Sequence, residues 1–515
     1  MVSRVTTVAF SGIDVQSVDV QVQLSSGQPA FIIVGLPDKA VAESKERIRA
    51  ALHASGLSLP SKRIVINLAP ADLPKEGSHY DLPIALGILV AIDALALDQL
   101  TSYVALGELS LDGTISSVSG VLLAAMHANS LDKGLICPDI CGSEAAWASA
   151  DLEILAGGSL IQLANHFKGT QVIGRPEPII RKAKPNSLDL KDMKGQETAK
   201  RALEVAAAGG HNMLMIGPPG AGKSMLAERL PSILPPLTPA ELLEVSMISS
   251  IAGKLEDGAL SDSRPFRAPH HSASVASLVG GGAGMRAKPG ELSLAHHGVL
   301  FLDEFPEFNP RALDSLRQPI ETGKVVIARS NFHVTYPAFI QLIAAMNPCR
   351  CGRYGEFGVT CRRGIRCAAE YQERISAPLW DRIDIVVEVF AVSASDMTST
   401  KRGDSSAEVM ARVMHARNRQ EKRLKESGII TPASTNAAMS PRQVEEIVQL
   451  DPDGRRLMET AVQKLQLSAR GYHRVLKVAR TLADLSQEDK VAREHLAEAL
   501  GYRSVISHSL REQSG

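Results

Sequence analysis

The octapeptide GPPGAGKS at residues 217–224 decides the fold of the central part of this chain. It has the form G-x-x-x-x-G-K-[ST], in which backbone N–H groups surround a phosphate and the lysine reaches its oxygens. The apolar run Met213–Ile216 before it predicts a buried strand, and Met225–Leu230 after it predicts a helix that ends at Pro231. This order of strand, loop and helix is the context that the motif requires, so we expect an α/β domain that binds ATP or GTP.

The residues of this loop have distinct expected parts. The glycines allow the tight curl of the backbone, Lys223 reaches the β- and γ-phosphates, and the Ser224 hydroxyl completes the shell of a Mg²⁺ ion. The expected nucleotide-binding loop consists of Gly217, Pro218, Pro219, Gly220, Ala221, Gly222, Lys223 and Ser224.

Length and composition restrict the class of protein. The 515 residues suggest about three domains. The 56 basic and 56 acidic side chains cancel, so a nucleic-acid partner requires a local basic patch. The apolar run 84–92 is about half of a membrane span, and the first residues contain no apolar signal sequence. Six cysteines in a chain of this length do not make a disulfide framework, so we expect a cytoplasmic protein without a membrane partner.

The pattern along the chain predicts an α/β region, the nucleotide-binding region and a helical region. Residues 1–168 alternate strand-like and helix-like runs, and residues 169–187, rich in proline and basic side chains, are a predicted linker. The nucleotide-binding domain is expected over 188–392 and a helical lid over 393–515. The helices predicted in the lid are 409–425, 441–449, 454–467, 474–485 and 493–500.

Two more apolar strands end in polar side chains. GVLFLDE, residues 298–304, places Asp303 to hold Mg²⁺ through water and Glu304 to orient and deprotonate the attacking water. QLIAAMN, residues 341–347, ends in Asn347, which is expected to reach the γ-phosphate or that water. The structural alternatives are solvated acids at a strand end and an ordinary turn before a proline.

Two arginines are candidates to stabilise charge on the phosphates. Arg382, in the stretch PLWDRID, is expected to project onto the nucleotide of a neighbouring subunit. The alternative is a structural salt bridge with Asp381 or Asp384. Arg470, in LSARGYHRVLKVAR, opens a helix of the predicted lid and is expected to contact the phosphates of its own subunit, with Arg474 as a competitor one turn later.

These motifs stand in the order found in AAA+ ATPases. The stretches KGQETAKRALEVAAAGGHN (194–212), FRAPHHSASVASLVGGG (266–282) and GELSLAHHG (290–298) make the chain similar to the magnesium-chelatase-like group, in particular to the YifB/ComM family, over essentially its whole length. The resemblance implies a homo-hexameric ring, because an arginine finger works across a subunit boundary. The roles it implies are Walker A for Lys223 and Ser224, Walker B for Asp303 and Glu304, sensor 1 for Asn347, arginine finger for Arg382 and sensor 2 for Arg470.

Residues 1–168 resemble the Lon-protease type of the ribosomal-S5-like α+β class. The likeness lies in NLAPADLPKEGSHYDLPIAL (67–86) and LGELSLDGTISSVSGVLLAA (106–125). Where Lon has its nucleophilic serine and activating lysine, this chain has His79 and Leu122. Acyl transfer needs a nucleophile and a base within hydrogen-bonding reach, so we expect a non-proteolytic domain that serves as a collar or binding platform.

Four cysteines lie close together in the segment 349–367. Cys349, Cys351, Cys361 and Cys367 provide enough thiolates for a tetrahedral Zn²⁺ site. Their spacing, C-x-C-x₉-C-x₅-C, is not the usual pair of C-x₂-C motifs, so the alternative is a set of reduced, unliganded thiols. Cys137 and Cys141 are predicted to be ordinary thiols.

The same segment is a candidate basic patch. Its five arginines, at 350, 353, 362, 363 and 366, are expected either to contact a phosphate backbone or to form a solvated charged face. Two other segments are candidates to line the pore of a ring. They are a hairpin over 324–336, with its turn at Ser330-Asn331, and the glycine-rich run 278–290.

The leading functional hypothesis is an ATP-driven DNA motor. The resemblance implies a hexamer that moves along branched or partly single-stranded DNA, as ComM relatives do as branch-migration helicases in recombination or natural transformation. The runner-up is an ATPase subunit for metal insertion into a porphyrin, because magnesium chelatases share the ATP core. A third hypothesis is a remodeller that threads protein through its pore. The choice of DNA as the cargo rests on the family resemblance.

Overall fold

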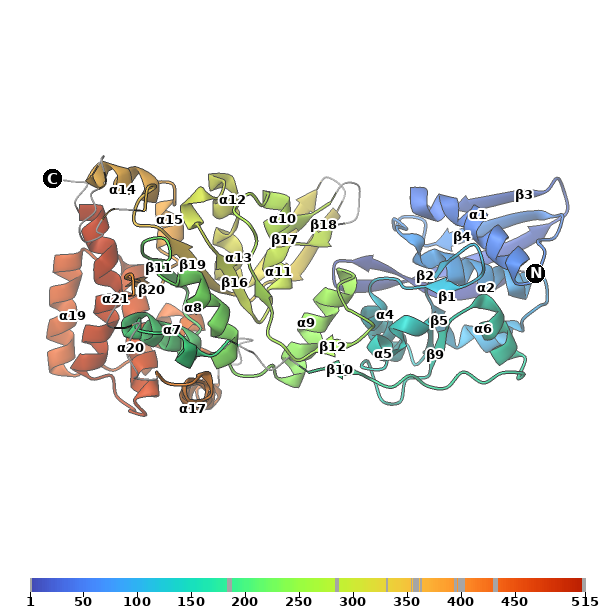
Figure 1. The fold of residues 1–515 in the computed structure, drawn as a ribbon. Helices are drawn as coiled ribbons and strands as arrows, with labels where there is room; N and C mark the ends of the chain where they lie inside the picture. The colour runs from blue at the N-terminus through green and yellow to red at the C-terminus, as the bar shows by residue number, and fades with distance from the viewer. Residues whose placement is uncertain are drawn as a thin grey trace.

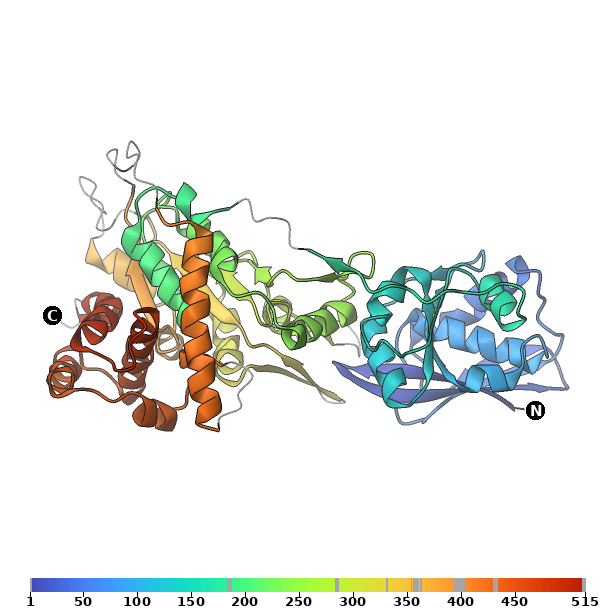
Figure 2. The ribbon, with the colours of Figure 1, turned by 90° about the horizontal axis from the view of Figure 1, so that it is seen from below.

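The computed structural model describes residues 2–182, 188–282, 287–329, 332–352, 354, 361, 364–392, 396, 403–428 and 434–511. These residues form two lobes placed end to end, with the amino-terminal residues in one lobe and the nucleotide-binding and carboxyl-terminal residues in the other (Figure 1). The view from below shows the same division (Figure 2). Within the described part of the chain, every helix is too short or too polar to span a bilayer.

The amino-terminal lobe contains a seven-stranded mixed sheet with the strand order β3-β4-β2-β1-β5-β8-β9. Strands β1, β2 and β4 pair antiparallel, and the remaining pairs are parallel. The strands are β1 (Val2–Ser11), β2 (Asp14–Ser25), β3 (Ala30–Val34), β4 (Arg63–Ala69), β5 (Tyr103–Ala105), β8 (Gly134–Pro138) and β9 (Ile154–Gly157). A small hairpin joins β6 (Glu108–Leu109) to β7 (Ile115–Ser116).

Helices cover this sheet and complete its core. The apolar helix α2 is buried over nearly its whole length, since its residues Leu82–Val90 are predominantly aliphatic. The helices of this lobe include α1 (Lys39–Ala54), α2 (Asp81–Ala91), α3 (Leu97–Thr101), α4 (Val121–Ser130), α5 (Gly142–Ala145) and α6 (Leu160–Phe167). The predicted strand-like and helix-like runs of residues 1–94 therefore coincide with β1–β4, α1 and α2. The expected mixed α/β fold is confirmed.

The second lobe is built on a five-stranded parallel sheet with the order β13-β16-β19-β11-β20. Its strands are β13 (Phe266–Arg267), β16 (Val299–Leu302), β19 (Gln341–Met346), β11 (Met213–Ile216) and β20 (Ile385–Glu388). Apolar residues run continuously along β11, β16 and β19 because both faces of the sheet are covered. Met213 and Met215 pack in one core, and Leu214 and Ile216 pack in the other.

The connections of this sheet carry short helices and two hairpins. The helices are α7 (Glu197–Gly209), α8 (Lys223–Arg229), α9 (Pro239–Ile251), α10 (Val275–Val279), α11 (Glu291–Leu294), α12 (Pro310–Ser315), α13 (Arg317–Thr322), α14 (Ile365–Gln372) and α15 (Ala377–Trp380), with a 3₁₀ turn η5 (Phe305–Glu307). The hairpins pair β17 (Lys324–Arg329) with β18 (Phe332–Pro337), and β14 (Gly280–Gly281) with β15 (Lys288–Pro289). Each hairpin lies where the sequence predicts a pore loop, and the predicted turn at residues 330 and 331 lies outside the described residues.

The carboxyl-terminal helices pack on the same side of the sheet as α7. They are α17 (Ser406–Glu426), α18 (Pro441–Ile447), α19 (Pro452–Leu465), α20 (Ala469–Leu485) and α21 (Arg493–Arg511). Val413 and Ala416 of α17 and Val475 of α20 join the core that contains Met213. The five predicted helices of this region are all present, although α20 begins earlier and α21 ends later than predicted.

Several contacts join the two lobes within the described residues. A Cβ atom on Gly12, in the turn between β1 and β2, would lie 2.6 Å from the Val334 side chain in β18. The Gly120 N–H, just before α4, donates to the Ser250 carbonyl of α9 at 3.1 Å. Part of the predicted linker is also ordered, because β10 (Ile180–Arg181) pairs with β12 (Leu260–Ser261) in the second lobe.

Candidate active site

Three polar segments leave the parallel sheet side by side. In the register, Ile216 at the end of β11 pairs with Met346, and Leu302 at the end of β16 pairs with Ala344, so all three strands end at the same edge. The residues that follow are Gly217, Asp303 and Asn347. Carboxyl ends of parallel strands are where α/β sheets bind their ligands, so the topology brings the predicted phosphate loop, acidic strand end and amide together.

The backbone conformation and close packing of the loop at 217–224 require glycine at the positions where the motif has it. Gly220 and Gly222 have φ angles of 78° and 90°, a region that favours glycine. A Cβ atom on Gly217 would lie 2.0 Å from the Val389 carbonyl oxygen, so only glycine fits between the loop and the segment after β20. These constraints explain the glycine spacing of the motif.

Lys223 is buried and points back into the loop. Its ammonium donates to the carbonyl oxygens of Gly217 at 2.7 Å and Pro218 at 2.9 Å, and to Asn347 Oδ1 at 3.3 Å. Burial lowers the pKa of Lys223, and the nearby Asp303 carboxylate opposes this shift. The structure thus brings the Walker A lysine and the predicted sensor 1 amide into direct contact.

Ser224 and Asp303 form the second pair of the site. The Ser224 hydroxyl donates to Asp303 Oδ2 at 2.6 Å. A hydroxyl and a carboxylate are the hard oxygen donors that Mg²⁺ prefers, so the two residues expected to hold Mg²⁺ fit that ion. The remaining carboxylate oxygen of Asp303 accepts from the Glu304 N–H at 2.8 Å, which fixes the turn after β16.

Glu304 has a partner that the sequence analysis does not predict. Its backbone is left-handed, with φ at 50°, and its half-exposed carboxylate lies 2.9 Å from Nδ1 of His271. His271 comes from the loop between β13 and α10, and its ring is tilted against that of His270, with 4.0 Å between the centroids. The stretch APHHS contains two adjacent histidines, but nothing in the sequence pairs them with residue 304.

Arg382 lies at the opposite edge of the sheet from its own phosphate loop. It precedes β20, and its carbonyl accepts from the Asn212 side chain at 3.0 Å, beside the first residue of β11. Its guanidinium donates to the carbonyls of Arg317 at 2.8 Å and Pro378 at 2.7 Å, and forms an ion pair with Glu321. The salt bridge considered in the sequence analysis, with Asp381 or Asp384, is therefore not the one that forms.

The two candidate arginines of α20 differ in their contacts. Arg474 forms an ion pair with the buried Asp384, whose carboxylate also accepts from the Asn212 N–H at 3.1 Å. Burial opposes ionisation of Asp384, but Arg474 and the other cations around it hold its pKa well below the usual range. Arg470 is exposed and has no ion pair among the described residues. Arg474 is therefore a structural residue, and Arg470 is the one available for a phosphate.

The position of α20 bears on the role expected for Arg470. Asp384 and Asn212 mark the amino ends of β20 and β11, whereas the phosphate loop follows the carboxyl end of β11. Arg470 lies one turn before Arg474 on a helix attached to the amino ends. This placement on the amino-end side of the sheet disfavours the expected contact of Arg470 with the phosphates of its own subunit, which stays a prediction.

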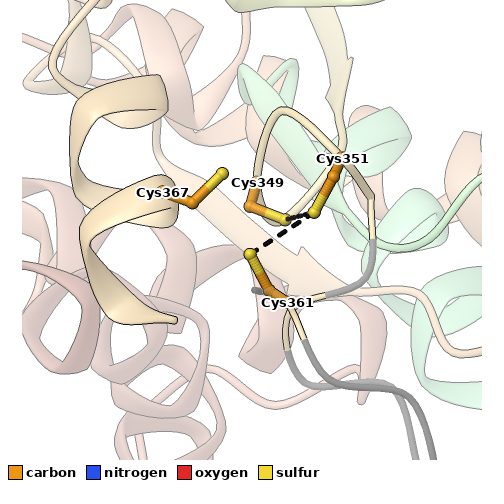
Figure 3. Close-up of side chains that lie close together, drawn as sticks. All are labelled: Cys349, Cys351, Cys361 and Cys367. Atoms are coloured by element: carbon orange, nitrogen blue, oxygen red, sulfur yellow. Dashed lines mark hydrogen bonds between the residues drawn. The ribbon is translucent and has the colours of Figure 1, made fainter. Parts of the chain in front are cut away.

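The four cysteines of segment 349–367 converge (Figure 3). Their sulfur atoms all lie within 4.8 Å of one another, with Cys349 to Cys351 at 3.2 Å and Cys351 to Cys361 at 3.4 Å. Disulfide sulfurs are separated by about 2 Å, whereas sulfurs around a tetrahedral Zn²⁺ ion, at about 2.3 Å from the metal, are about 3.8 Å apart. The donor set and its spacing therefore fit zinc. Cys137 and Cys141 are buried elsewhere.

The proposed basic patch of this segment is only partly visible. Arg350 and Arg366 are exposed, and arginines 353, 362 and 363 lie outside the described residues. The two candidate pore hairpins are packed together, because a Cβ on Gly280 would meet Ile327 at 2.9 Å and the Tyr336 hydroxyl donates to the Ala287 carbonyl at 2.9 Å.

The Lon-like positions of the amino-terminal lobe have structural roles. His79 is buried, and its Nε2 is 2.9 Å from the Val8 carbonyl, to which it donates. Ser78 donates to the Glu108 carboxylate. Leu122 is buried, and its N–H donates to Glu144 at 2.9 Å. These contacts explain why the segment keeps its shape without the serine and lysine of Lon.

Comparison with known proteins agrees with this geometry along the whole chain. Family models described as subunit ChlI of Mg-chelatase, magnesium chelatase subunit ChlI and the ChlI C-terminal region match residues 20–140, 189–397 and 403–503. Competence protein ComM of Haemophilus influenzae is 42% identical over 504 residues, which cover 97% of this chain and 96% of ComM. The chain belongs to the YifB/ComM family.

Other relatives refine this assignment. The uncharacterised protein YifB of Escherichia coli is 41% identical over 509 residues, 98% of this chain and 97% of YifB. Lon protease 2 of Bacillus subtilis is 26% identical over 164 residues, 30% of this chain and 29% of that protease, a partial similarity. As a magnesium-chelatase-like member of the YifB/ComM family, the chain is an AAA+-type ATPase.

Proposed function

We propose that the chain is the subunit of a homo-hexameric, ATP-hydrolysing motor that moves branched or partly single-stranded DNA. The observation that carries the ATPase part is the meeting of Lys223, Ser224, Asp303 and Asn347 at one edge of the sheet. The DNA part is supported by the full-length similarity to a protein named for competence. The four-cysteine cluster is proposed to hold a structural Zn²⁺ ion.

The residues of the site divide the reaction between them. Lys223 presents its ammonium to the phosphates, and its contacts with the loop carbonyls fix the orientation of its side chain. Bound Mg²⁺ would supply charge neutralisation on the phosphates, with Ser224 and Asp303 as its protein ligands. Glu304 takes the proton of the attacking water, and Asn347 orients that water from its contact with Lys223.

The neighbouring subunit completes the site in this proposal. Arg382 and Arg470 both belong to the amino-end side of the sheet, away from the phosphate loop of their own subunit. In a ring they would face the phosphate loop of the next subunit, where a guanidinium stabilises the charge of the transition state. Two arginines on the side of the sheet away from their own phosphate loop support an oligomer in this proposal.

ATP-dependent migration of a three-stranded DNA substrate tests this function. The full chain should move strands with ATP, and the Glu304→Gln variant should bind ATP and DNA without moving strands. Lys223→Ala should lose ATP turnover with an unchanged circular dichroism spectrum, because the contacts that it removes lie within the phosphate loop and at Asn347 and leave the helices and strands in place. An active ATPase that neither binds nor moves DNA at low salt would reject the DNA motor and leave a metal-insertion ATPase or a protein remodeller to be tested.

A further inference from the structure

The cysteine cluster lies directly beside the ATP site. Only Pro348 separates Asn347, which contacts Lys223, from Cys349, the first cysteine. The Gly352 N–H donates to the Cys349 carbonyl at 2.9 Å and closes a tight turn around Cys351. Asn347, the predicted sensor 1 residue, is therefore linked to the first cysteine of the cluster through Pro348 alone, whose ring restricts the backbone.

This turn also touches the phosphate loop. Gly352 has a φ angle of 77°, and a Cβ atom on it would lie 2.7 Å from Cδ of Pro219. Pro219 is the third residue of the phosphate loop. Glycine is thus required at position 352 both for the backbone conformation and for the close approach, and the cluster turn rests against the loop that encloses the phosphates.

The fourth cysteine connects the cluster to the acidic strand end. Cys367 lies in α14, whose buried residue Tyr371 packs one turn later in the core beneath β16. Just beyond this helix, Arg374 forms an ion pair of 2.7 Å with Glu307. Glu307 belongs to η5, which begins directly after Glu304. The cluster therefore joins the phosphate loop, the sensor 1 strand and the segment that carries the general base.

Apolar packing around the cluster is small. Among the described residues, its core comprises Cys349, Cys367 and Ala368, with Tyr354 and Cys361 packed against it. Two side chains other than the cysteines, Ala368 and Tyr354, cannot hold the four cysteine positions in place, whereas four thiolate bonds to one ion can. The neighbouring exposed Arg350 and Arg366 offset the negative charge that four thiolates keep around Zn²⁺.

We propose that the zinc-loaded cysteine cluster is a positioning site for ATP hydrolysis, which clamps Asn347 and Pro219 in place against Lys223. Metal occupancy then controls turnover, while the fold of the two lobes does not depend on it. This inference rests on the proposed ATPase function and extends it to a ligand, Zn²⁺, and to a form of control.

Two variants test the two halves of the proposal on the full chain. Cys351→Ser removes the exposed ligand and should lower zinc content, measured by atomic emission, from about one ion per chain to below a tenth, and kcat by about 10- to 100-fold. Gly352→Ala should keep the zinc and still lose turnover, with weaker binding of a fluorescent ATP analogue. Cys141→Ser, a buried thiol outside the cluster, is the matched control and should match the parent protein in zinc and kcat.

Each outcome of these experiments tests a different part of the proposal. Parent protein without zinc overturns the metal assignment, and loss of zinc with unchanged kcat and analogue affinity overturns the clamp. If Cys351→Ser does not fold, zinc is removed from the parent protein with a chelator and is then returned. Turnover must be lost on removal and restored on return; otherwise the clamp is rejected. Zinc content and analogue affinity can be measured without hydrolysis. If the parent protein binds zinc but does not hydrolyse ATP, the proposed function is rejected. The clamp is then tested by the affinity for the ATP analogue alone.

Discussion

Glu304 is the residue whose surroundings most directly govern the chemistry. A general base must offer a free carboxylate oxygen to water, but one oxygen of Glu304 faces His271 at 2.9 Å. In the proposed mechanism Glu304 is the general base, and this contact leaves one of its two oxygens occupied by His271 and not by water. The loop that carries His271 therefore restrains Glu304 in the structure described here.

Replacement of His271 should release this restraint. We expect His271→Ala to raise kcat for ATP hydrolysis in the absence of DNA by about 2- to 10-fold, because the carboxylate becomes free to accept a proton. Steady-state phosphate release measures it. His270→Ala is the control, since Nδ1 of His270 contacts Ser272 at 2.8 Å and not Glu304. Equal changes in both variants, or a fall in kcat in His271→Ala, would contradict the restraint.

Single residues were predictable where their role depends on near neighbours in sequence. The positions of Lys223 and Ser224 in the site were predictable, because the loop geometry is encoded in eight consecutive residues. His271 was not, because its partner lies on another strand and only the sheet order β13-β16 brings the two together. The same holds for Glu321, the partner of Arg382, which the sequence did not distinguish from nearer acids.

Among the elements, α9 and the turn before β16 are joined by a pair of histidines. His296 Nε2 lies 3.0 Å from Glu244, and its Nδ1 accepts from the Phe339 N–H at 3.1 Å. The accepting Nδ1 places the ring proton on Nε2, which donates to Glu244. Glu244, His296 and His297 lie close enough for a metal, but this tautomer leaves His296 without a free nitrogen for it.

This junction should make the second lobe sensitive to acid. Burial, with the adjacent His297, lowers the pKa of His296 to about 4, whereas an unfolded histidine has a pKa near 6.5. As the pH falls, the unfolded state binds the proton first, so the free energy of unfolding decreases between about pH 6.5 and pH 4, by no more than about 3 kcal/mol. Fluorescence of Trp380, in a Trp147→Phe background, reports the unfolding of this lobe.

A paired variant identifies the source of that pH dependence. His296→Gln keeps a donor for Glu244 but does not titrate, so its unfolding free energy should change less over the same pH interval. His53→Gln, at an exposed position in the other lobe, should keep the slope of the parent protein. An unchanged slope in His296→Gln would assign the effect to other groups.

Helices and strands were largely predictable, and their packing was not. The hydrophobic periodicity located α17 to α21 because each has one apolar face. Periodicity does not say which strand ends a helix covers, so only the structure shows that α20 is attached to Asp384 at the amino ends of the strands. Periodicity also does not reveal that Ile180–Arg181, within the predicted linker, pairs with a distant segment.

In the molecule as a whole, the two lobes are coupled through the candidate pore hairpin. The turn at Gly12 packs on Val334 of β18, and α4 is bonded to α9 through Gly120 and Ser250. Residues more than a hundred positions apart make these contacts, so no local pattern could reveal them. A movement of the hairpin would therefore displace the residues of the amino-terminal lobe that contact it. Such coupling is consistent with the role of a collar on a ring that is predicted for this lobe.

The proposed function depends most on adjoining subunits completing each ATP site. The direct measurement is the ATPase activity of an equal mixture of Arg382→Ala and Glu304→Gln proteins after subunit exchange. Each variant alone should be inactive. In mixed rings about a quarter of the interfaces combine an intact Glu304 with a neighbour's intact Arg382, so about that fraction of the parent activity should return. No activity in the mixture, with mixed rings shown to form, would contradict the claim and leave Arg382 as a structural residue.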